Sequence, residues 1–202
     1  MSCIKNKDIF NFQTILVPLG DLWVIMNLTL IRHTSVAVAP GICYGQSDVD
    51  VVASTFEAEA GQVLLNLRGK TFDAVYCSPL SRCRKLADFC GFTNPIVDKR
   101  LLELSFGNWE MKRWTDIEDH RLECWYDNWL SETPTQGESF NTMINRVEEF
   151  LLEIKKLPYQ HVAIFTHAGV IRSTGIITKQ FSVTEAFDYK VEYGECHDFI
   201  LQ

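Results

Sequence analysis

An Arg-His pair closes the apolar run at residues 28 to 34, LTLIRHT. A buried strand ordinarily ends in turn-forming residues such as Gly, Asn or Asp, so a cation joined to a titratable ring at this place needs an explanation. A guanidinium can bind an anion, and an imidazole can attack an electrophile or carry a proton near neutral pH. Arg32 and His33 alone are explained as well by a solvated strand end, so the rest of the chain must decide.

Two further apolar runs carry similar groups just beyond their ends. The run FDAVYC leads through Ser78 to Arg82, and HVAIFTH ends at His167. Ligands of parallel α/β sheets bind beyond the carboxyl ends of the strands, so these groups are expected to meet Arg32 and His33 at one rim. Arg82 falls in the first turn of an expected helix, where the helix dipole favours anions and disfavours a cation. A bound dianion would reverse that penalty, because the helix N-terminus and the guanidinium would both face negative charge. Singly, Arg82 would be a surface residue and His167 a packed one; together they predict an anion site.

The elements that position these groups alternate between strand and helix. Helical spacing of apolar residues follows Ser54-Thr-Phe-Glu57, which has the form of a capping box, and includes Phe56, Ala60, Val63, Leu64 and Leu67. Ser78 is expected as an N-cap with Pro79 at the first helical position, and Gly91 is expected to close that helix. The longest amphipathic pattern runs from Phe140 to Ile154.

The C-terminal third completes the pattern. A helix is expected to begin at Ala168, directly after the strand HVAIFTH, and the last strands are expected at KVEY and HDFIL. Alternation of this kind predicts a three-layer α/β/α fold, with a mostly parallel central sheet and helices on both faces. We expect one domain over residues 26–202. Residues 1–25 are an N-terminal extension for which two interpretations stay open: an upstream reading of the start codon, or an extra packed segment.

Composition excludes several classes of protein. The formal net charge of −7 argues against a nucleic-acid partner, because phosphate backbones recruit basic surfaces. The seven cysteines form no CxxC pair and no Cys/His metal spacing, so reduced thiols in the cytoplasm are expected. We expect no metal and no cofactor. The apolar stretch within residues 1–25 is too short and too broken by Pro18 and Asp21 to span a membrane.

Five segments in order resemble the histidine phosphatase superfamily, in its branch with the cofactor-dependent phosphoglycerate mutases. They are LIRHT, CSPLSRCRKLAD, LLELSFGNWE, PTQGESF and FTHAGVIR, and the resemblance extends from Asn27 to the C-terminus. One position departs from the family pattern: Thr34 stands where Arg-His-Gly is usual. A β-branched residue at that position is a concern only if the backbone there needs a positive φ.

The resemblance implies a catalytic role for each residue of the rim. His33 would attack phosphorus and form a phosphohistidine, while Arg32, Arg82 and His167 would bind the phosphoryl oxygens. The cationic surroundings would keep His33 unprotonated, and we expect its ring to face solvent at the strand end, outside the core. Glu103 matches the position of the general acid and base. Glu110 stays open as the alternative proton donor.

The resemblance also suggests where the substrate is chosen. The segment at about 106–134 falls where the family places a helical cap over the phosphate pocket, and it contains Trp109, Trp114, Trp125 and Trp129. Any of these rings could pack or stack on a flat ligand. The residues expected to contact substrate are Thr34, Tyr44, Gly45, Gln46, Ser47, Trp109, Glu110 and Ala168.

Within the family, Tyr44 to Asp48 and the run SFGNWE are most similar to alpha-ribazole phosphatases, which act in assembly of the cobalamin nucleotide loop. The expected substrate is therefore a small phosphomonoester, alpha-ribazole 5′-phosphate. A broad sugar or nucleotide phosphatase, or a mutase-like enzyme, is the alternative, and a phosphate-binding module without catalysis is a distant third. The sequence leaves a homodimer open.

Overall fold

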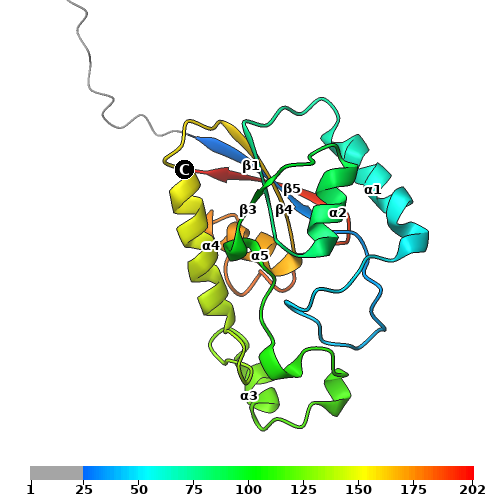
Figure 1. Ribbon diagram of the computed structural model, residues 1–202. Helices are drawn as coiled ribbons and strands as arrows, with labels where there is room; N and C mark the ends of the chain where they lie inside the picture. The colour runs from blue at the N-terminus through cyan, green and yellow to red at the C-terminus, as the bar shows by residue number, and fades with distance from the viewer. Residues whose placement is uncertain (1–24) are drawn as a thin grey trace, which may run out of the picture.

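The computed structural model describes residues 25–202, and the expectation for residues 1–25 lies almost wholly outside that range. Its centre is a five-stranded sheet in the order β3-β2-β4-β1-β5 (Figure 1). Three strands and a short edge strand are parallel, and only β5 is antiparallel to its neighbour. The strands are β1 (Met26–Arg32), β2 (Ala74–Cys77), β3 (Ile96–Val97), β4 (His161–Thr166) and β5 (Cys196–Leu201).

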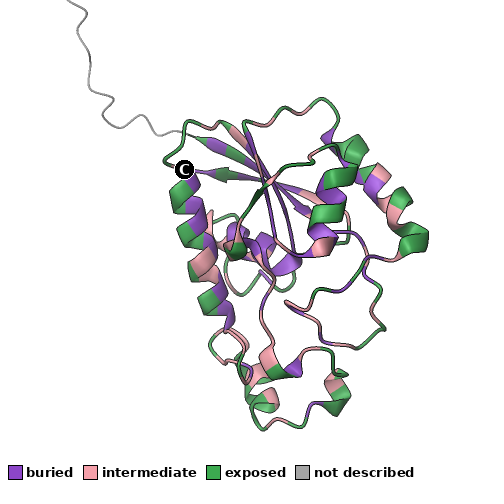
Figure 2. Cartoon of the chain, in the orientation of Figure 1, coloured by how far each residue is buried: buried purple, intermediate pink, exposed green. Residues whose placement is uncertain are grey.

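Helices cover both faces of this sheet. On one face, α1 (Ala53–Leu67) and α2 (Ser81–Phe89) pack on Ile31 and Phe165. On the other, α4 (Phe140–Ile154) and α5 (Ala168–Ile177) pack on Leu30 and Ile164. Neighbouring residues in a strand point to opposite faces, so the central strands β1, β2 and β4 supply both cores and are largely buried, whereas both residues of the edge strand β3 are exposed (Figure 2). This arrangement confirms the predicted three-layer α/β/α fold.

A small helical segment stands apart from the sheet, at the lower end of the molecule in Figure 1. It contains two short 3-10 helices, Gly107–Trp109 and Trp114–Asp116, and the two-turn helix α3 (Arg121–Asp127). Trp109 and Ile117 form its own small core together with Cys43 from the long loop after β1. We call residues 107–135 the cap. A third 3-10 helix, Lys99–Leu101, lies before it.

Three local predictions were wrong. Helix α1 begins at Ala53, so Ser54 lies inside the helix and no side chain caps it. Helix α2 begins at Ser81 with Leu80 at the N-cap, and the Ser78 hydroxyl contacts His167 and the Leu80 amide before the helix begins. Residues 190–193 form no strand: the Val191 carbonyl accepts from Arg32, and Gly194 with φ of 69° turns the chain into β5.

Other local predictions were confirmed. Gly91 ends α2 in the left-handed conformation at φ of 91°, and its amide donates back to Asp88. The amphipathic pattern from Phe140 to Ile154 is one helix. In α1, Ala60, Val63 and Leu67 are buried, whereas Leu64 is exposed. Within residues 25–202, no helix combines the length and apolar character that a bilayer crossing requires.

Candidate active site

The four groups expected at the rim do meet there. His33 directly follows β1, and its amide donates to the Thr166 carbonyl at the end of β4. The rings of His33 and His167 meet edge to face with centroids 5.1 Å apart. Arg32 and Arg82 are close enough to His33 for their charges to act on its pKa. The parallel register of β1 and β4 thus places both imidazoles side by side at the carboxyl edge of the sheet.

His33 is held as a neutral ring with one defined tautomer. Its Nδ1 is 2.7 Å from the Thr34 carbonyl oxygen, which can only accept, so Nδ1 carries the hydrogen and Nε2 keeps a free lone pair. Burial lowers the pKa of His33 well below its usual value, and the positive charges of Arg82 and Arg32 lower it further. A neutral imidazole with a free lone pair on Nε2 is a nucleophile.

The expectation that His33 faces solvent is wrong, since its side chain is only 1% exposed. Tyr193 lies over it with ring centroids 5.6 Å apart, and the same ring stacks on the Arg32 guanidinium at 3.8 Å. The Tyr193 hydroxyl is 2.9 Å from that of Tyr44, on the loop after β1. Tyr44 and Tyr193, which are distant in the sequence, therefore cover His33 and Arg32.

Main-chain carbonyls orient both arginines. Arg82 is fully buried, and its Nη1 and Nη2 donate to the carbonyls of Ser47 and Gly45 at 2.9 and 2.8 Å. Arg32 donates from Nη1 to the Val191 carbonyl. Among the described residues, the Nε atoms of both arginines have no hydrogen-bond partner, and no carboxylate lies within ion-pair distance of either. The two cations are thus positioned but not neutralised.

His167 caps the start of α5 and is fully buried. Its Nε2 lies 2.8 Å from the Ser78 hydroxyl, which fixes the orientation of the ring. Burial lowers its pKa well below the usual value, and the positive charges of Arg82 and Arg32 act in the same direction. Both histidines are therefore neutral at pH 7.

The loop at residues 44–47 is organised by Glu110. Its carboxylate accepts from the amides of Gln46, Ser47 and Phe106 and from the Ser47 hydroxyl. Gln46 in turn donates from its side chain to the Glu103 carbonyl. Both oxygens of Glu110 are thus occupied in holding the loop whose carbonyls orient Arg82.

Glu103 lies at the amino end of α5, on the wall of a cavity of about 220 Å³ between the core and the cap. Its Oε1 accepts from the amides of Leu104 and Gly169, at 2.9 and 3.2 Å. The other cavity residues are largely aromatic or apolar, with Arg172 as the cationic one: Ile42, Cys43, Tyr44, Gly45, Leu104, Phe106, Trp114, Trp125, Phe140, Gly169, Arg172 and Phe187. Glu103 is the one carboxylate residue among those that line this cavity.

The remaining expected contact residues differ in placement. Thr34 is buried and does not have a positive φ, so the threonine causes no backbone strain in place of glycine. Ala168 is the first residue of α5 and packs in the core. Trp109 is 1% exposed and donates to Asp119, so it belongs to the core of the cap and does not line the cavity, contrary to expectation.

Sequence reasoning missed three residues of this region. Ser78 was assigned to a helix cap, and Tyr193 fell in a stretch expected to be a strand. Arg172 lies within the motif FTHAGVIR, where it is the single cation of the apolar helix AGVIRSTGII, and that was a visible signal. The placement of Ser78 and Tyr193 depends on contacts between distant segments, which no local pattern encodes.

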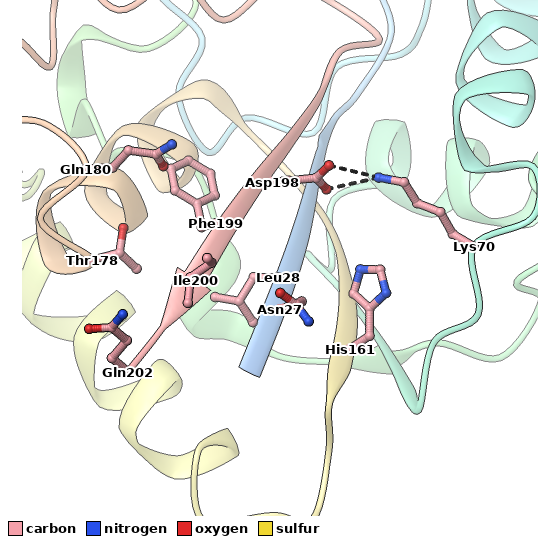
Figure 3. Close-up of a pocket in the computed structure, with 10 residues that line it drawn as sticks. All are labelled: Asn27, Leu28, Lys70, His161, Thr178, Gln180, Asp198, Phe199, Ile200 and Gln202. Carbon is pink, nitrogen blue, oxygen red and sulfur yellow. Dashed lines mark hydrogen bonds and ion pairs between the residues drawn. The ribbon is translucent and has the colours of Figure 1, made fainter. Parts of the chain in front are cut away.

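A larger hollow of about 580 Å³ lies at the opposite end of the sheet, beside the amino ends of β1 and β4 (Figure 3). Asp198 on its wall accepts from Lys70 and from Thr29, and Thr29 also contacts His161. None of the residues of the candidate site lines it.

Comparison with known proteins identifies the class. Residues 28–198 match the model of the histidine phosphatase superfamily (branch 1), and the chain belongs to this family. It is 30% identical over 154 residues to an adenosylcobalamin/alpha-ribazole phosphatase of Escherichia coli strain K12, covering 72% of this chain and 75% of that one. It is 35% identical over 157 residues to a Hydrogenobacter thermophilus protein described as a candidate phosphoserine phosphatase, with the same coverage.

Solved structures agree with this family. The alpha-ribazole phosphatase from Shigella flexneri superposes with a TM-score of 0.78 at 27% identity, covering 86% of this chain and 89% of that one. The predicted family is therefore confirmed.

Proposed function

We propose that this protein is a phosphomonoesterase that works through a phosphohistidine on His33. The observation that carries the proposal is the buried, unneutralised charge of Arg82 beside Arg32 and the neutral His33. A buried cation without a counter-ion is costly, and a phosphoryl group would supply the missing charge. The unpartnered Nε atoms of both arginines offer it further donors.

The reaction then proceeds in two steps: transfer of the phosphoryl group to His33, and hydrolysis of the phosphohistidine. His33 Nε2 attacks phosphorus, the P–N bond forms, and the P–O bond to the leaving group breaks while Arg32, Arg82 and His167 bind the phosphoryl oxygens. Protonated Glu103 gives its proton to the departing oxygen. Water next attacks phosphorus, Glu103 takes a proton from it, and the P–N bond breaks to release phosphate and neutral His33.

Glu103 is assigned as the proton donor because of its surroundings. It lies on the cavity where a leaving group would fit, whereas the Glu110 carboxylate is saturated by four donors and lies outside the cavity. The function of Glu110 is to hold the loop at residues 44–47.

The favoured substrate is alpha-ribazole 5′-phosphate. Support comes from the names of the relatives from Escherichia coli and Shigella flexneri and from the aromatic cavity next to Glu103. A flat base can stack on such rings. The second candidate is a phosphoserine phosphatase, which the relative from Hydrogenobacter thermophilus favours. A phosphate-binding module without catalysis is the third reading.

Two measurements test this proposal. Phosphate release is compared for alpha-ribazole 5′-phosphate, phosphoserine, 3-phosphoglycerate, ribose 5-phosphate and nitrophenyl phosphate; we expect the first to be preferred, and a preference for phosphoserine overturns the substrate. Acid quench during turnover should trap label on His33 and lose it in His33→Ala. Because His33 is buried, His33→Asn serves as the second variant, and label on His167 would refute the nucleophile assignment.

A further inference from the structure

Two residues that line the cavity between core and cap each carry a buried donor without an acceptor. The indole Nε1 of Trp125 and the guanidinium Nε of Arg172 are both buried, and neither has a hydrogen-bond partner among the described residues. A buried donor without a partner costs on the order of 1 to 3 kcal/mol. An acceptor brought by a ligand would remove that cost, so these groups indicate what the cavity binds.

The two donors belong to opposite walls. Arg172 comes from α5, as does Gly169, whose amide bonds Glu103, so Arg172 lies on the core wall. Its contacts are weak: Nη2 is 3.4 Å from the Tyr189 carbonyl, and the guanidinium lies 5.7 Å from the centre of the Phe187 ring. Trp125 comes from α3 on the cap wall and stacks on Trp114, with centroids 5.6 Å apart and an angle of 23°.

The size and lining restrict the occupant. A volume of about 220 Å³ falls below the roughly 300 to 1,000 Å³ of sites for drug-sized ligands, which suits one flat ring system. Trp125 donates only, and so does Arg172, so the ligand must present acceptors to them. The one carboxylate on the wall, Glu103, already accepts two amide bonds.

Resting on the proposed function, we infer that Trp125 and Arg172 determine specificity by donating to acceptors on the leaving group. Trp125 bonds the unsubstituted ring nitrogen of a benzimidazole-type base that has no N–H of its own. Arg172 bonds a sugar oxygen, because it shares the core wall with Glu103, where the ester oxygen must lie to be protonated.

A change in both enzyme and substrate tests the assignment of Trp125. The substrates are alpha-ribazole 5′-phosphate and its analogue in which CH replaces the free ring nitrogen. One neutral hydrogen bond is worth about 0.5 to 1.5 kcal/mol, so the unaltered enzyme should favour the nitrogen compound about 2- to 13-fold in kcat/KM. In Trp125→Phe this preference should vanish, whereas Trp114→Phe, the matched control, should keep it. The assignment of Trp125 is wrong if all three proteins prefer the nitrogen compound equally, or if the unaltered enzyme shows no preference for it.

The assignment of Arg172 is tested with Arg172→Met, which keeps most of the length and removes the donors. Hydrogen bonds to a charged group are worth about 1.5 to 3 kcal/mol, so the ratio of kcat/KM for alpha-ribazole 5′-phosphate to that for nitrophenyl phosphate should fall about 10- to 100-fold. An unchanged ratio refutes the role. If Arg172→Met lowers kcat/KM for phosphoserine more than for alpha-ribazole 5′-phosphate, Arg172 binds the carboxylate of phosphoserine and the inference is overturned.

These outcomes are distinct from failure of the proposed function. If the unaltered protein hydrolyses none of the esters, the phosphatase proposal fails. If it hydrolyses them and the ratios do not move, only the assignment of Trp125 and Arg172 fails.

Discussion

The amide of Gly169 donates to both carboxylate oxygens of Glu103, at 3.2 and 3.3 Å. Gly169 is the second residue of α5, so the carboxyl group lies at the positive end of the helix, next to the cavity. The contact depends on glycine: a Cβ at position 169 would overlap Glu103 Oε1 and fall 2.8 Å from the Met143 methyl group.

Gly169→Ala should therefore displace the Glu103 side chain. General acid catalysis contributes about 10²- to 10⁴-fold, and we expect kcat for an alkyl phosphate to fall by at least about tenfold. Gly61→Ala is the matched control, because Gly61 is also helical and a Cβ there meets nothing within 4 Å. The measurement is kcat for both variants beside thermal unfolding. Equal activity of Gly169→Ala and Gly61→Ala would refute this coupling.

The two carboxylates can be separated with leaving groups of different quality. Glu103→Gln removes the transferable proton, so an alkyl phosphate should lose about 100-fold or more in kcat, and nitrophenyl phosphate far less because its phenolate leaves without help. Glu110→Gln weakens the hold on Gln46 and Ser47 and should lower both activities alike. Equal losses for both esters in Glu103→Gln would return Glu110 to consideration.

Much of this arrangement followed from local sequence. Apolar runs and the helical spacing from Phe140 to Ile154 predicted the layers, because burial of a strand or a helix face imposes its period on the sequence. Cations and imidazoles placed at or shortly after the ends of three strands predicted their meeting, since parallel strands end at the same edge. The family resemblance supplied the expected roles of Glu103 and His33.

What the sequence could not supply were contacts between distant segments. Ser78 has the form of an N-cap, but the helix starts three residues later, and the Ser78 hydroxyl lies 2.8 Å from the ring of His167, 89 residues further along the chain. His33 was expected at the surface, and Tyr193 covers it from a turn 160 residues further along the chain. Trp109 and Trp125 look alike in sequence, yet only the second lines the cavity.

Burial of the two central histidines makes stability depend on pH. Burial lowers the pKa of His33 and His167 well below their usual values, so the unfolded chain binds more protons than the folded one below about pH 6.5. The free energy of unfolding should therefore fall as the pH falls from about 7 to 5. Each such group contributes at most about 1.4 kcal/mol per pH unit to the slope.

His167→Gln isolates one of these contributions, because the amide can keep a hydrogen bond to Ser78 and cannot be protonated in this range. Denaturant unfolding at several pH values should give a shallower slope for this variant. The pKa values of His161 and His197 are also lowered by burial, but both groups are present in the two proteins and cancel in the comparison. Identical slopes would mean that the pKa of His167 is the same in the folded and the unfolded chain.

The four cap tryptophans should divide into two kinds. Trp114 and Trp125 line the cavity, and stacking on a base is worth about 1 to 3 kcal/mol, so Trp→Leu at these positions should lower kcat/KM for alpha-ribazole 5′-phosphate by about tenfold relative to nitrophenyl phosphate. Trp109 fills the core of the cap, and Trp129 packs on Phe140 and Phe187. Their replacement by Leu should lower the free energy of unfolding, for Trp109 by about 3 kcal/mol, and leave the ratio of the two activities nearly constant. Steady-state kinetics and denaturant unfolding of all four variants test this division. If the ratio of the two activities changes in proportion to the lost stability in every variant, the four rings serve only for packing, and a flat substrate loses its structural support.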